Sequence, residues 1–129
     1  MKRAFMPVLA VAITMSGCSS SDDRLSSECA MIDKTVNVPV DADFDEAKFA
    51  AQLRTLRAKL KDRNLADQVG IIAENWEAHA KVKPGTTYNP ENPEQQARDK
   101  LRDRSIGAEN QLYATCNKTG NWHDNRPKS

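Results

Sequence analysis

Residues 74–79, Glu-Asn-Trp-Glu-Ala-His, gather carboxylates, an imidazole and a tryptophan within six positions. Two carboxyl groups beside a tryptophan match in composition the sites that handle glycans, where the two groups flank the scissile bond. Glu74 and Glu77 are three residues apart, so on a helix they would share one surface and could not flank a bond. We therefore expect Trp76 to be a core residue, with both glutamates and His79 in solvent.

Other catalytic or metal-binding patterns are not recognisable in the sequence. It has no Gly-rich phosphate loop, no Gly-x-Ser-x-Gly turn and no His-Glu-x-x-His pair. His79 and His123 lack further ligands at a spacing that could hold zinc. A nucleophilic cysteine would also need a histidine in a defined place beside it. We expect no catalytic residue, no metal and no cofactor, and so a protein that is not an enzyme.

The first 17 residues have the organisation of an export signal. Lys2 and Arg3 precede an apolar run over 4–14, followed by small residues and Cys18. The run is shorter than the roughly 20 residues that cross a bilayer, so a transmembrane helix is the poorer interpretation. Residues 1–17 are therefore expected to be a signal peptide.

Residues 15–18, Met-Ser-Gly-Cys, resemble the lipobox of bacterial lipoprotein precursors, with Met15 in the place of the usual leucine. The resemblance implies cleavage after Gly17, diacylglycerol on the Cys18 sulfur and acylation of the new amino terminus. In Gram-negative lipoproteins an aspartate after the cysteine favours the inner membrane. Ser19 stands there, so the resemblance implies an outer-membrane anchor facing the periplasm. The alternative is an ordinary secretory signal followed by an incidental cysteine.

Lipid on Cys18 would leave Cys29 and Cys116 as an even pair in an oxidising compartment. We then expect one disulfide between them. Closing so long a loop stabilises a fold by roughly 4 to 5 kcal/mol in the chain-entropy model. Such a bond would compensate for the small apolar core of this chain.

Length and charge narrow the class of partner. The chain has 129 residues, suited to one small domain, with 19 basic and 18 acidic side chains. Removing the signal peptide would leave 17 basic residues against 18 acidic ones, a net charge of −1. Such a balance offers no large basic face, so we expect no nucleic-acid partner.

Apolar spacing and capping residues predict an all-α fold, a small bundle of three main helices plus a short N-terminal helix held by the disulfide. A flexible tether over 18–24 and a disordered tail over 118–129 would flank a helical domain at 25–117. The predicted helices cover 24–34, 44–62, 65–82 and 93–116.

The boundaries rest on specific residues. Asp43 and Asn64 are the predicted N-caps of the second and third helices, and Asn92 caps the last. An extended connector is expected over 36–43, and a loop over 83–93. The apolar stripe of the second helix leaves its other sides to basic residues, interpreted as a solvated face: Arg54, Arg57, Lys59 and Lys61.

A helical domain on a lipid anchor without a catalytic set predicts a protein-binding module of the inhibitor, immunity, exclusion or accessory-assembly kind. Its partners would be the membrane, through Cys18, and an envelope protein, contacted by an exposed patch near Tyr88. The alternatives are a glycan- or peptidoglycan-associated protein that uses Glu74 or Glu77, and a structural spacer between membrane and wall.

Overall fold

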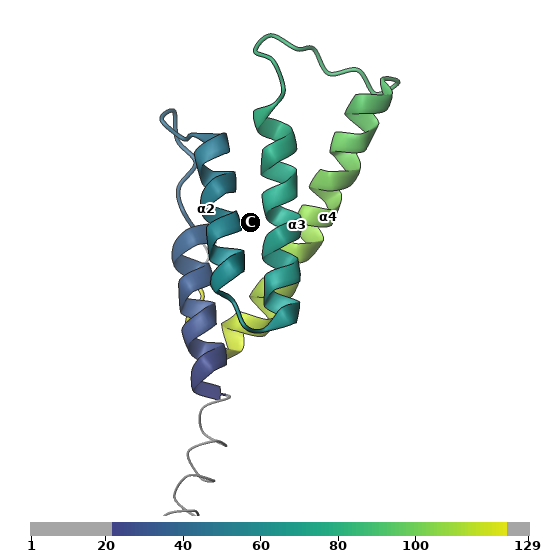
Figure 1. The fold of residues 1–129 in the computed structure, drawn as a ribbon. Coiled ribbons are helices and arrows are strands. Elements are labelled where there is room, and N and C mark those ends of the chain that lie inside the picture. The colour runs from purple at the N-terminus through teal and green to yellow at the C-terminus, as the bar shows by residue number, and fades with distance from the viewer. Residues whose placement is uncertain (1–21, 124–129) are drawn as a thin grey trace, which may run out of the picture.

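The computed structural model describes residues 22–123, which form a bundle of helices without a β-strand among them (Figure 1). The all-α prediction is therefore confirmed. Cys29 and Cys116 form the expected disulfide, with Cα atoms 5.3 Å apart, and both side chains are fully buried. The predicted signal peptide and Cys18 lie outside the described residues.

The N-terminal helix covers 22–36 within the described part of the chain, so 22–24 are helical rather than part of a flexible tether. Cys29 and Ile32 on its inner face are fully buried. Glu28 is buried on the same helix, and its Oε1 accepts the backbone N–H groups of Lys61 and Asp62 at 2.7 and 3.0 Å. This carboxylate thus joins the helix to the turn between α2 and α3.

The second helix, α2, spans Glu46–Lys59, and its N-cap is Asp45 rather than the predicted Asp43. The Asp45 side chain accepts the Lys48 N–H at 3.0 Å. Phe44 directly precedes the cap and packs on Phe49, with ring centroids 5.1 Å apart. This pair forms a hydrophobic staple, which fixes where the chain enters the helix and so selects the later aspartate.

The third helix, α3, spans Arg63–Ala80 and packs against both α2 and α4. Its N-cap is Asp62, whose side chain accepts the Leu65 N–H at 3.0 Å, and not the predicted Asn64. Apolar residues at helical spacing form its buried face, since Leu65, Val69 and Ile72 are each at most 1% exposed.

The fourth helix, α4, spans Pro93–Cys116 and begins as predicted, with the Asn92 side chain accepting the Glu94 N–H at 2.8 Å. Only its C-terminal half is buried in the bundle, whereas Ala97 in the N-terminal half is exposed. Figure 1 shows the reason, since α4 diverges from α3 toward the loop that joins them.

The segment after α4 folds back on the N-terminal helix instead of forming the disordered tail expected from residue 118. A short 3₁₀ turn, η1 (Asn117–Thr119), ends at Gly120, whose φ is 78°. The Asn121 side chain then donates to the carbonyl and hydroxyl oxygens of Ser26 at 3.1 and 2.6 Å. Residues 118–123 are therefore part of the domain, and 124–129 lie outside the described residues.

Candidate functional site

Trp76 lies in an aromatic cluster between α2 and α3. Its ring centroid is 5.3 Å from that of Phe44 and 5.5 Å from that of Phe49, both in edge-on arrangements. His79 is exposed at the rim of this cluster, and its Nδ1 lies 2.8 Å from a carboxylate oxygen of Glu46. Trp76 thus packs against the core, as the sequence predicts, while His79 pairs with α2.

The two glutamates near Trp76 have different surroundings. Glu74 is exposed, whereas Glu77 accepts two hydrogen bonds from the Arg54 guanidinium at 2.6 and 3.1 Å. These hydrogen bonds hold the pKa of Glu77 below its usual value despite partial burial. A carboxylate kept ionised in this way is unsuited to the proton donation that glycoside hydrolysis requires.

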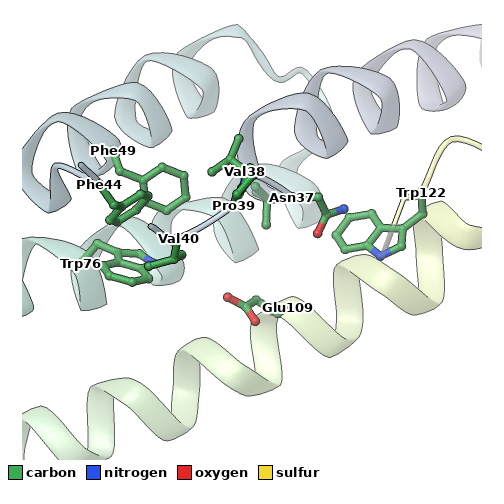
Figure 2. A pocket seen from close by; sticks show the side chains of 10 residues that line it. Asn37, Val38, Pro39, Val40, Phe44, Phe49, Trp76, Glu109 and Trp122 are labelled. Atoms are coloured by element: carbon green, nitrogen blue, oxygen red, sulfur yellow. The ribbon is translucent and has the colours of Figure 1, made fainter. Parts of the chain in front are cut away.

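A groove of about 310 Å³ opens between the connector after the N-terminal helix, α3 and α4 (Figure 2). Val40 lines it and is 67% exposed, the most exposed of the large apolar side chains in the described part of the chain. The residues that line the groove are mainly apolar: Val36, Asn37, Val38, Pro39, Val40, Phe44, Phe49, Trp76, Glu109 and Trp122.

One acidic residue lines this apolar groove, and an acidic segment includes another of its lining residues. Glu109 belongs to α4 and lies across the groove from the connector, as Figure 2 shows. The segment 41–46, Asp-Ala-Asp-Phe-Asp-Glu, carries four further carboxylates, and Phe44 within it lines the groove. The site therefore combines apolar walls with one lining carboxylate, Glu109, and an acidic segment adjoining Phe44 in the sequence, which favours a ligand with an apolar side chain next to a basic group.

Trp122 forms the end of the groove that lies farthest from Trp76 (Figure 2). Its ring centroid is 6.2 Å from that of Tyr113 on α4. The indole N–H is buried and has no acceptor among the described residues. From the sequence, Trp122 and His123 belonged to a disordered tail, so this wall of the groove was missed.

The loop around Tyr88 forms a different kind of surface. Tyr88 is 60% exposed, and its hydroxyl donates to Asp99 on α4 at 3.2 Å, which raises the pKa of the phenol. The neighbouring hollow of about 230 Å³ lies between the end of α3 and the start of α4 and includes polar residues such as Gln95 and Arg98. The exposed apolar residues of the connector gather instead at the groove.

Within residues 22–123, no three His, Cys, Asp or Glu side chains are placed to hold a metal ion. No helix in this part of the chain is both long and apolar enough to cross a bilayer. Comparisons with protein-family models, with curated proteins and with solved structures found no match for the chain.

Proposed function

We propose that this protein is an envelope lipoprotein, anchored through acylated Cys18, whose helical domain binds another envelope protein in the groove beside Val40. The bound segment would present apolar side chains to the groove and a basic group to Glu109. The observation that carries this proposal is the groove itself, whose walls are apolar and open to solvent and include the carboxylate of Glu109.

The connector that forms one wall suits recognition of an extended segment or of one face of a helix. Val38 and Val40 alternate with polar or breaking residues, and Pro39 keeps this stretch out of helix. Because the two tryptophans and Glu109 belong to different elements, the folded bundle holds the walls in place before a ligand arrives. Preorganisation of this kind reduces the entropy lost on binding.

The glycan-associated alternative has less support. Its candidate acid, Glu77, is engaged by Arg54, and Glu74 lies on the same helix three residues away. The spacer alternative is disfavoured for a different reason, since the helices return on one another and a disulfide closes the bundle.

The anchor and its location remain part of the proposal. The lipobox-like residues 15–18 and the even pair of cysteines left after acylation support it. Intact mass of the protein purified from native membranes tests the anchor, since residues 18–129 plus acyl groups are expected. A mass without acyl groups would remove the membrane from the proposal without affecting the groove.

The groove is tested by placing a photo-crosslinking amino acid at Val40 in the full-length protein in its native host. Ile106 on α4 supplies the matched control, because it is 49% exposed and outside the groove. We expect a discrete crosslink from position 40 to one segment that is apolar and basic, and none from position 106. Equal crosslinking at both positions would contradict a specific site.

A synthetic peptide of the crosslinked segment then allows affinity to be measured through tryptophan fluorescence. Val40→Lys places a positive charge beside the groove and removes an apolar contact, so we expect at least a tenfold loss of affinity. Ile106→Lys makes the same chemical change elsewhere and should leave affinity unchanged. Equal affinity of the two variants would refute the groove as the binding site.

A further inference from the structure

Four basic residues lie where α2 ends and α3 begins: Arg57, Lys59, Lys61 and Arg63. All four are exposed, and none forms an ion pair with a carboxylate of residues 22–123. Arg54, one turn earlier, differs because Glu77 neutralises it. Arg57, Lys61 and Arg63 line an open hollow of about 600 Å³ together with Arg54 and Asp67. Lys59 lines a separate hollow with Lys34 and Lys48.

This basic turn lies at the end of the bundle where the described chain begins. Glu28 in the N-terminal helix accepts the backbone N–H groups of Lys61 and Asp62. These hydrogen bonds attach the basic turn to that helix. Figure 1 shows the start of that helix and the α2–α3 turn at the same end. Cys18 precedes residue 22 by four Cα–Cα steps, which reach at most about 15 Å. A lipid on Cys18 would therefore keep the basic turn at the membrane-proximal end of the domain, from which a tilt of the domain brings it to the surface.

We propose that the basic turn is a docking surface for a bilayer of anionic phospholipids. This inference rests on the acylation of Cys18 within the proposed function. Each Lys or Arg near an anionic surface strengthens attraction about fivefold, and the effect decays within a Debye length of about 8 Å at physiological salt. The acyl anchor supplies proximity, and the basic turn sets the orientation of the domain.

An acidic segment lies at the opposite end of α2 from the basic turn. The acidic segment 41–46 precedes α2, whereas the basic turn follows it, so the two lie at the two ends of one helix. Near the basic turn, Asp62 caps α3 and Asp67 is exposed, while Asp22 and Asp23 begin the N-terminal helix. An anionic surface would attract the α2–α3 turn and repel those two aspartates and the acidic segment. The domain would then tilt so that the α2–α3 turn faces the lipid and the acidic segment 41–46 faces away from it.

Lysine labelling tests this orientation with the full lipidated protein. The protein is reconstituted in vesicles of phosphatidylcholine alone, or with 30% phosphatidylglycerol, and an amine-reactive reagent is followed by peptide mass spectrometry. We expect Lys59 and Lys61 to react at least threefold more slowly on the anionic vesicles. Lys83 and Lys100, near the far end of the bundle, should react at equal rates on both. Salt at 0.5 M should abolish the difference, because the Debye length shortens.

Two double arginine variants distinguish an effect of the basic turn from an effect of the total charge of the protein. Arg57→Ser with Arg63→Ser keeps both reporter lysines, and we expect their protection to disappear. Arg102→Ser with Arg104→Ser removes the same charge from exposed positions on α4 and should leave protection intact. Equal labelling of Lys59 and Lys61 on the two kinds of vesicle would overturn the proposal. Protection by soluble glycerol phosphate at the same phosphate concentration would also overturn it, because a membrane surface would not be required.

If Cys18 is not acylated, the experiment gives a different result than if the basic turn does not bind the bilayer. A protein without acyl groups is identified by its mass and does not float with phosphatidylcholine vesicles. A lipidated protein that floats with both kinds of vesicle and shows no protection contradicts only the docking surface.

Discussion

Asp33 on the N-terminal helix binds His123 in the last described part of the chain. One carboxylate oxygen accepts the backbone N–H of His123, the other lies against its ring Nδ1, and both distances are 2.6 Å. Asp33 is 8% exposed, so these contacts satisfy a carboxylate that burial would otherwise disfavour. Together they hold Trp122 in the wall of the groove.

The Asp33 contacts predict acid-sensitive stability. Burial raises the pKa of Asp33, but hydrogen bonds from His123 and Asn37 outweigh it, so the pKa in the folded state lies below 3.8. The ionised form therefore favours the folded state at any pH above that value, and its contribution is lost as pH falls through the folded pKa. We expect the free energy of unfolding from urea titrations to drop below about pH 4.

Asp33→Asn tests the same contacts at neutral pH. We expect a loss of about 1.5 to 3 kcal/mol, the range for hydrogen bonds to a charged group, and a flatter pH dependence below pH 4. Asp67→Asn removes the same charge from an exposed position and should change stability by less than about 0.5 kcal/mol. Identical acid profiles for wild type and Asp33→Asn would show that the His123 contact does not contribute.

The sequence predicted the main helices because their signals are local. Phe49, Leu53 and Leu56 recur at helical spacing, and Asn92 with Pro93 marks a start that no distant contact overrides. The caps of α2 and α3 were wrong by two residues, since several polar residues compete at each start. Contacts such as the Phe44–Phe49 staple decide between them.

Loss of the disulfide should weaken the whole domain. Cys29 and Cys116 are 87 positions apart, for which the chain-entropy model gives roughly 4 to 5 kcal/mol. We expect Cys29→Ala with Cys116→Ala to unfold at much lower urea concentration, and trypsin to cleave after Lys118 sooner. Wild-type protein treated with a reductant should behave in the same way. An unchanged urea midpoint in both samples would mean that packing alone closes the bundle.

The groove could not be predicted from the sequence for a physical reason. Its walls come from the connector, α3, α4 and the segment after it, and only tertiary contacts bring Val40, Glu109 and Trp122 to one site. Trp122 follows a stretch rich in Asn, Gly and charge, which locally resembles a disordered end. Distant contacts to Ser26 and Asp33 order that stretch. The available signal was the alternation of valines over 36–40, which also fits a plain connector.

Replacing each of three glycines by alanine should change the free energy of unfolding, and the sign of the change depends on the position. Gly120 has a φ of 78°, where a side chain is strained, so Gly120→Ala should cost about 1 kcal/mol. Gly107 lies in α4 with nothing within 4 Å of an added Cβ, so Gly107→Ala should stabilise by about 0.5 to 1 kcal/mol. A Cβ on Gly70 would lie 3.0 Å from Arg57 Nε and 3.2 Å from its Cδ.

Gly70→Ala is the informative member of this set, because its sign depends on whether Arg57 can move. Arg57 is exposed and its contacts with Gly70 involve the end of a flexible side chain, so we expect a gain of about 0.5 kcal/mol in urea titrations. Gly107→Ala is the control, because an added Cβ there meets no neighbour and the change in stability reports helix propensity alone. A loss of stability in Gly70→Ala alone would mean that Arg57 is fixed against α3. Its guanidinium could then not turn toward a lipid headgroup, and the basic turn would depend on Lys59, Lys61 and Arg63.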